Sequence, residues 1–190
     1  MSERRGGPRI PPLDVGALSP AQRRVHDAIA AGPRGVVAGP LAVWLESPEL
    51  ASRAQELGAF CRYASSLPGR LSELAILVTA AHWKAGYEWH VHAPLAVAAG
   101  VAPAAVDAIR AGEDPPLEPP DERAVHDFAR ELLGTRRVSE ETYRRALAHL
   151  GQQGVVELVG ILGYYALISM TICAFEVPVP EGAAEPFSEP

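Results

Sequence analysis

Apolar residues along this chain recur at the three- and four-residue intervals of helices, and no useful stretch alternates as a strand does. Within 47–64, for example, Leu50, Ala54, Leu57 and Cys61 lie on one stripe. Prolines and glycines mark where successive segments begin and end. We predict an all-α fold whose helices span 21–31, 41–46, 47–64, 71–85, 87–99, 103–111, 121–133, 139–150 and 155–175.

The domain organisation follows from the length and from the two flanks. A chain of 190 residues fits one domain of ordinary size. We expect a disordered N-terminal segment at 1–18, one helical domain at 19–177 and a flexible Pro-rich tail at 178–190. The loop at 112–120 contains four prolines but is too short to separate two domains.

The apolar stretch at 155–177 must be weighed as a membrane span. A true span usually has ~20 residues with few interruptions, and this stretch contains Glu157, Ser169 and Thr171. A helix that is apolar all round is otherwise buried in a protein core or a subunit core. We therefore expect no membrane partner, and we interpret the stretch as the central helix of a homo-oligomer.

Charge and cysteine content exclude several classes of protein. A formal net charge of -6 leaves no basic surplus to displace counterions from phosphate, so no nucleic-acid partner is expected. Cys61 and Cys173 lie far apart and suggest neither a disulfide framework nor a zinc site. The first residues lack the apolar core of a secretion signal, so a cytoplasmic location is expected.

The candidate chemistry lies in two neighbouring helices. Glu88 and His92 are four residues apart, so their side chains lie on one face of a helix. Glu73 opens the preceding apolar helix. An acid and an imidazole held together in apolar surroundings can move a proton near neutral pH.

These motifs resemble the core of a known family. The runs at 70–77 (RLSELAIL) and 86–100 (GYEWHVHAPLAVAAG) are similar to the carboxymuconolactone decarboxylase family, which also contains the alkylhydroperoxidase AhpD. The run at 163–180 is similar to the closing helix of its decarboxylase-like members. The resemblance covers about 39–180 and implies an AhpD-like helical bundle that forms trimers or hexamers, with sites near subunit contacts.

One departure from the family excludes thiol peroxidase chemistry. The peroxidase branch has a CxxC pair at the positions of Ala85 and Glu88, then a histidine at His92 and a proton-relaying glutamate at Glu73. This chain keeps Glu73 and His92 but has neither cysteine. Peroxide reduction by that route needs a nucleophilic thiolate and a resolving thiol.

The decarboxylase branch also carries Glu-x-x-x-His at this place. The resemblance implies a lyase that removes CO2 from a lactone carboxylate and delivers a proton to carbon, without a cofactor. His92 would be the general acid or base, Glu88 would orient it or share its proton, and Glu73 would be a second carboxylate.

Three residues are expected to bind the small-molecule substrate. Many relatives have an arginine directly before the Glu73 position, where this chain has Ser72. Arg70 remains as an anchor for a substrate carboxylate, because its fork suits bidentate binding. Trp89 and Tyr165 are the aromatic residues expected to line the pocket.

Other interpretations of the same residues stay open. Glu88 and His92 can be a structural pair that satisfies itself, or two ligands of a metal whose third ligand comes from elsewhere. The chain can also be a non-catalytic helical oligomer that binds a small ligand or a partner. His90 is expected to point away from the Glu88–His92 face.

The remaining histidines and Cys173 are expected to have no part in a site. His82 is expected to pack or to lie at the surface. Cys173 is expected to be a buried apolar residue. The other histidines are expected to be solvated: His26, His126 and His149.

Overall fold

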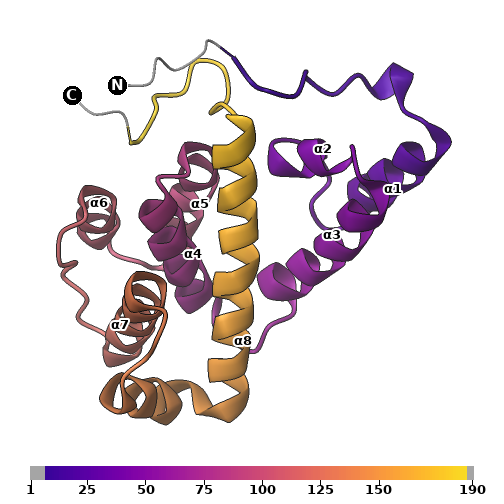
Figure 1. The fold of residues 1–190 in the computed structure, drawn as a ribbon. Coiled ribbons are helices and arrows are strands. Elements are labelled where there is room, and N and C mark those ends of the chain that lie inside the picture. The colour runs from indigo at the N-terminus through magenta and orange to yellow at the C-terminus, as the bar shows by residue number, and fades with distance from the viewer. Residues whose placement is uncertain (1–6, 188–190) are drawn as a thin grey trace.

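The computed structural model describes residues 7–187, and within this range the chain forms helices and no strand (Figure 1). The predicted all-α fold is confirmed. A 3-10 helix, η1, spans Val15–Ala17. The α-helices are α1 (Pro20–Ala31), α2 (Pro40–Trp44), α3 (Pro48–Tyr63), α4 (Gly69–Trp83), α5 (Gly86–Ala99), α6 (Pro103–Ala111), α7 (Pro120–Thr135) and α8 (Glu140–Phe175).

Local signals account for most helix boundaries. Ser19 accepts from the backbone N–H of Gln22, and the Gln22 side chain accepts from the Ser19 N–H, which forms a capping box before α1. Five helices (α1, α2, α3, α6 and α7) begin with proline in the first turn, where the missing N–H has no intrahelical partner to lose. The predicted and observed bounds of these helices therefore differ by no more than two residues.

The predicted gap between the last two helices is reduced to one residue. Gly151 has φ 68° and ψ 175°, which is not helical, so α8 consists of two helical arms joined by a kink: a short arm before Gly151 and a long arm after it. Only glycine adopts such a backbone conformation readily. The two arms of α8 therefore run in different directions.

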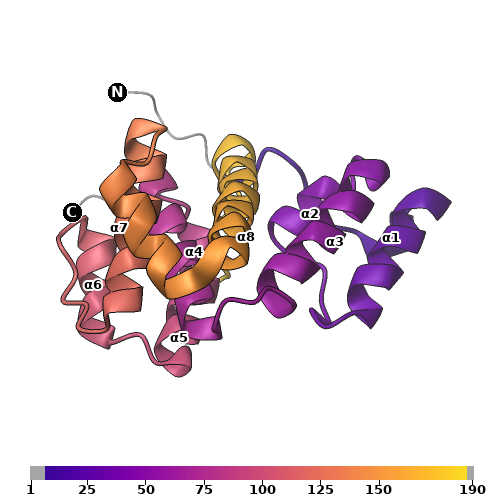
Figure 2. The same ribbon diagram turned by 90° about the horizontal axis from the view of Figure 1, so that it is seen from below.

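The long arm of α8 lies between two groups of helices. α1–α3 lie on one side of it and α4–α7 on the other (Figures 1 and 2). Within the second group α4 contacts α5, α6 and α7 as well as α8. Residues 74–80 of α4 are all buried, so α4 is the helix that is covered on every side.

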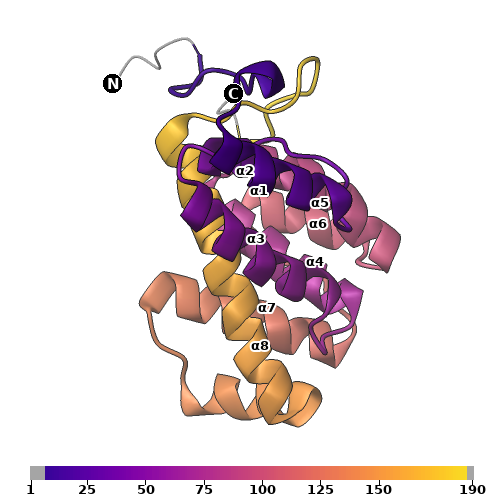
Figure 3. The same ribbon diagram turned by 90° about the vertical axis from the view of Figure 1, so that its right-hand side faces the viewer.

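The closing helix α8 is only partly covered within the single chain. α8 is long and apolar enough to cross a membrane by length and composition, but half of its most apolar stretch is buried against other helices. Its opposite face stays exposed and includes Val156 (67% exposed), Val159 and Met170. Figure 3 shows why: α1–α3 cover only the upper part of the long arm, and its lower part extends beyond them.

The predicted stripe of α3 is also corrected. Ala54 and Cys61 are buried as expected, but Leu50 and Leu57 are exposed. Small residues form the buried face because α3 lies close to α8 and α1. The larger leucines consequently add to the exposed apolar surface.

Both flanks of the domain make defined contacts, although the sequence predicts a disordered start and a flexible tail. The Arg9 side chain donates to the carbonyl of Ala174 and forms an ion pair with Glu176 at 2.8 Å. On the tail, the Phe187 ring packs edge-on against Trp89 with centroids 5.4 Å apart. Residues 1–6 and 188–190, which belong to the same predictions, lie outside the described range.

Candidate functional site

The connection between α4 and α5 brings the predicted acid and imidazole groups together. Lys84 ends α4 in the left-handed conformation, and the N–H of Ala85 bonds to the carbonyl of Ala80 at 2.9 Å. Only two residues therefore separate the helices, which pack side by side (Figure 1). The face of α5 that carries Glu88 and His92 consequently meets the start of α4.

His92 lies between two carboxylates, one at each ring nitrogen. Its Nδ1 is 2.6 Å from Oε2 of Glu73, and its Nε2 is 3.0 Å from Oε1 of Glu88. His92 is 2% exposed and Glu88 5% exposed, whereas the Glu73 side chain keeps 13% of its surface in contact with solvent. We call this group the proton cluster. Glu88 forms its buried, inner end, and the partly exposed Glu73 forms its outer end.

The charges of the proton cluster set the protonation state of His92. Burial alone lowers the pKa of an imidazole, but the neighbouring carboxylates of Glu88 and Glu73 outweigh this effect and raise the pKa of His92 to about 9. His92 is therefore protonated at neutral pH and can donate from both nitrogens. The sequence alone suggests that His92 titrates near neutral pH. In the structure its pKa is higher, so the proton is held more firmly.

This protonation state also bears on the metal interpretation. An imidazole binds a metal through the lone pair of an unprotonated nitrogen, and both nitrogens of His92 face carboxylate oxygens. Among residues 7–187, no group of three or more His, Cys, Asp or Glu side chains is arranged to hold a metal ion. The proton cluster thus suits proton transfer better than coordination.

Tyr165 of α8 completes the surroundings of His92. The two rings meet edge-on with centroids 5.2 Å apart. The Tyr165 hydroxyl is buried, and no group in the described part of the chain forms a hydrogen bond with it. Burial raises the pKa of Tyr165 well above its ordinary value, so the phenol stays neutral and able to donate. An unpaired buried hydroxyl costs ~1–3 kcal/mol, which suits a group that meets a ligand.

The structure places the other two predicted binding residues elsewhere. Arg70 forms ion pairs with Asp121, at 2.7 Å, and with Glu122, so its fork links α4 to α7 and is already occupied. Trp89 is buried and packs against Phe187 of the tail. The structure therefore brings together four of the six predicted site residues: Glu73, Glu88, His92 and Tyr165.

Some of the predictions for the remaining histidines and for Cys173 are confirmed, and others are wrong. His90 is exposed and points away from the proton cluster, and His82 and His149 are also exposed, as predicted. The prediction that His126 is solvated is wrong, because the packing of α7 leaves it only 3% exposed. Cys173 is exposed rather than buried, and its Sγ donates to the carbonyl of Trp83 at 3.3 Å.

Solved structures with the same architecture define the class of fold. The chain superposes on an alkylhydroperoxidase AhpD core protein, described as peroxidase-related, from Ralstonia eutropha JMP134 with a TM-score of 0.75 and 15% identity, over 92% of this chain and 93% of that one. A peroxidase-related protein from Silicibacter sp. TM1040 gives 0.72 and 14%, over 94% of each chain. The debrominase Bmp8 gives 0.71 and 15%, over 92% of each. The fold is AhpD-like.

The central segment of the sequence resembles a known family. Residues 48–131 match the carboxymuconolactone decarboxylase family. This segment contains Glu73, Glu88 and His92, so the resemblance carried by these motifs is confirmed. No curated protein matches the chain.

Proposed function

We propose that the chain is a cofactor-free lyase or proton-transfer enzyme that acts on a small carboxylated or lactone-like molecule. The observation that carries this proposal is the buried, protonated His92 between Glu73 and Glu88. The match of the segment 48–131 to the carboxymuconolactone decarboxylase family supports the same reaction class.

The proton cluster has the parts that a decarboxylation needs. When the bond from carbon to the carboxylate breaks, CO2 leaves and the electron pair stays on the substrate as an enolate. His92 then delivers its proton to carbon and becomes neutral. Glu73, at the outer end of the cluster, passes a proton from solvent back to His92. The Tyr165 hydroxyl donates a hydrogen bond to the enolate oxygen.

The cysteines argue against a thiol-based alternative. Ala85 and Glu88 occupy the positions of the CxxC pair. Burial raises the pKa of Cys61. Partial loss of water around the thiol of Cys173, together with the nearby carboxylate of Glu185, raises the pKa of Cys173, so the fraction of reactive thiolate is lowered at each. Both thiols are free and neither belongs to the proton cluster. We accordingly propose that the chain belongs to a branch of the family without thiol peroxidase activity.

A small ring is a suitable substrate size for this fold. A cysteine-to-alanine variant of the debrominase Bmp8, solved in complex with 2,3,4-tribromopyrrole, superposes on the chain with a TM-score of 0.67 and 16% identity, over 98% of this chain and 96% of that one. A lactone carboxylate is of similar size. The ring would lie against Tyr165, with its reacting carbon facing His92.

Turnover of γ-carboxymuconolactone by the wild type and by His92→Gln and Glu73→Gln tests this proposal. We expect the wild type to release CO2 and each folded variant to lose about 100-fold or more in kcat/KM, as when a general acid is removed. His90→Gln, on the exposed face of the same helix, is the matched control and should keep full activity.

Two outcomes would redirect the proposal. Full turnover in a folded His92→Gln variant would contradict the role of the proton cluster. A folded wild type that turns over neither this lactone nor other small lactone carboxylates would favour the alternative function, a non-catalytic helical oligomer that binds a small ligand or partner.

We further propose that the chain forms a homo-oligomer, a trimer or hexamer, in the cytoplasm. The exposed apolar face of α8 borders a groove of about 460 Å³ between α8 and α3, where Leu57, Phe60 and Val156 meet. A second copy would cover this surface. Light scattering after size exclusion should show the oligomer, and Val156→Glu should dissociate it, whereas Ala104→Glu on the exposed side of α6 should not. A monomeric wild type would contradict this.

A further inference from the structure

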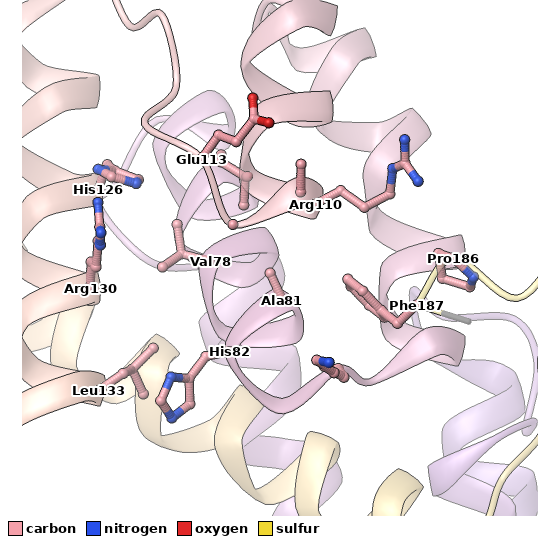
Figure 4. Close-up of a pocket in the computed structure, with 14 residues that line it drawn as sticks. Val78, Ala81, His82, Arg110, Glu113, His126, Arg130, Leu133, Pro186 and Phe187 are labelled. Carbon is pink, nitrogen blue, oxygen red and sulfur yellow. The ribbon is translucent and has the colours of Figure 1, made fainter. Parts of the chain in front are cut away.

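A cavity of about 550 Å³ opens beside the C-terminal end of α4, away from the proton cluster. None of Glu73, Glu88 or His92 lines it. In Figure 4, His126 and Arg130 of α7 lie on one side of the cavity, Pro186 and Phe187 of the tail lie on the other, and α4 lies between them. The volume falls in the range of small-molecule sites, about 300–1,000 Å³.

The charge around this cavity is opposite to that of the whole chain. Although the formal net charge is -6, the lining includes only one carboxylate, that of Glu113. Five lining side chains are cationic or can become so: His82, Lys84, Arg110, His126 and Arg130. Such a concentration of positive charge in a concave, partly apolar site attracts anions.

The cations of the cavity are poorly satisfied within the chain. Neither Lys84 nor Arg130 forms an ion pair with any residue between 7 and 187, and the nearest carboxylate to Arg110, that of the exposed Asp107, is 3.8 Å away. Six arginines outside the lining do have carboxylate partners at 3.3 Å or less: Arg9, Arg53, Arg70, Arg123, Arg144 and Arg145. The guanidinium groups of the cavity are therefore free to bind an external carboxylate.

The apolar part of the lining defines the rest of the ligand. Val78 and Ile109 are buried and Leu133 is half-buried. The Phe187 ring adds an aromatic wall, and its edge-on contact with Trp89 holds this wall in place. A ligand that matches both parts of the lining has an apolar body and an anionic head.

His126 adds a buried, neutral imidazole to the lining of the cavity. Burial lowers the pKa of His126, the nearby Arg123 and Arg130 also lower it, and Asp127, 3.2 Å from Nδ1, only partly offsets these effects. An imidazole that is neutral at pH 7 carries one N–H, and here Nδ1 donates it to the Asp127 carboxylate, so Nε2 remains as an acceptor. The open rim thus supplies the charge and the buried His126 supplies a hydrogen-bonding group.

We propose that this cavity is a binding site for a small organic carboxylate with an aromatic or other apolar ring, separate from the proton cluster. Arg130 and Arg110 bind the carboxylate, and Val78, Ile109 and Phe187 contact the ring. This site stands on its own geometry and would remain if the proton cluster had no catalytic role.

Titration calorimetry with 2-naphthoate and with the uncharged 2-naphthamide tests the proposal. We expect the wild-type chain to bind 2-naphthoate at micromolar to millimolar concentration and to bind the amide at least about 10-fold more weakly, because the amide cannot form the charge-assisted hydrogen bonds. No binding of 2-naphthoate, or equal binding of the two compounds, would overturn the proposal.

Two sets of variants locate the binding. Arg130→Gln and Arg110→Gln, each exposed and therefore compatible with folding, should each weaken 2-naphthoate binding ~10-fold. Arg137→Gln, equally exposed but outside the lining, is the matched control and should bind like the wild type. Binding that survives both cavity substitutions would overturn the site. Unchanged binding by folded His92→Gln would show that the cavity is separate from the proton cluster, and lost binding there would contradict that separation.

Discussion

The two ends of α4 border two polar regions of opposite character. Near its start, Glu73 belongs to the proton cluster, where His92 is buried and each ring nitrogen has a carboxylate partner. Near its end, His82 borders the cavity, where Arg130 and Lys84 lie at the surface without an ion-pair partner between residues 7 and 187. In the first region the charged side chains pair with one another. In the second region the cations have no such partner and can pair with a ligand.

The difference has an energetic consequence. Removing one member of a buried ion pair leaves an uncompensated charge and costs ~3–5 kcal/mol, whereas an exposed charge contributes ~0–1 kcal/mol. The chain therefore depends on the proton cluster for its folding as well as for any chemistry. The exposed cations of the cavity, Lys84, Arg110 and Arg130, can be replaced with little effect on stability.

The largest expected effect is that of His92→Ala. Without the imidazolium, Glu73 and Glu88 share a largely buried space with no cation between them, so the free energy of unfolding should fall by ~3–5 kcal/mol. Chemical denaturation measures this loss. His90→Ala, on the exposed face of α5, should change stability by no more than ~0.5 kcal/mol. Equal stabilities for the two variants would refute the buried ion pair.

The pH dependence of stability should be the next largest effect. The pKa of His92 is raised from 6.5 to about 9 in the folded chain, so its protonation favours the folded state. This contribution is fully present below pH 6.5 and is lost as pH rises through 9, which amounts to roughly 3 kcal/mol at most. Denaturation between pH 6 and 10 should show this decline in the wild type, and His92→Gln should remove it. A decline of the same size in the variant would assign it to other groups.

Tyr165→Phe should have a smaller effect on stability and a clear one on catalysis. The hydroxyl has no partner among the described residues, so its removal should leave the free energy of unfolding unchanged or raise it by about 1 kcal/mol. If the hydroxyl stabilises an enolate, kcat should fall while the fold persists. Tyr143→Phe, at an exposed position on the short arm of α8, serves as the control. A clear loss of stability in Tyr165→Phe would instead indicate a structural partner.

Arg130→Gln should have the smallest effect on folding. Arg130 is exposed and borders the cavity without an ion pair, so we expect a change within ~0.5 kcal/mol. Thermal unfolding beside Arg137→Gln measures this difference. A loss of several kcal/mol would show that the guanidinium supports the fold, and the contrast between the two ends of α4 would disappear.

Local signals explain why the helices and half of the proton cluster are predictable. The capping box at Ser19 and the prolines that open helices act within a few residues, and the i, i+4 spacing places Glu88 beside His92 before any tertiary contact is considered. The family resemblance adds Glu73. Its contact with His92 depends on how α4 packs against α5.

Long-range packing explains what the sequence does not reveal. Arg70 pairs with Asp121 and Glu122, which lie 51 and 52 residues further along the chain, so its occupied fork leaves no local pattern. His126 is buried because α7 packs against α4 and α8. The i, i+4 spacing of His126 and Arg130 does not predict a cavity, because the cavity also needs α4, α6 and the tail.

The contact between Phe187 and Trp89 links the position of the tail to the fluorescence of a tryptophan. Trp89 is one of three tryptophans, and Phe187 of the tail lies edge-on against its ring. When the tail leaves this position, water reaches the indole of Trp89 and its emission shifts to longer wavelength. Because Phe187 also forms a wall of the cavity, displacement of the tail would open the cavity and expose Trp89 at the same time.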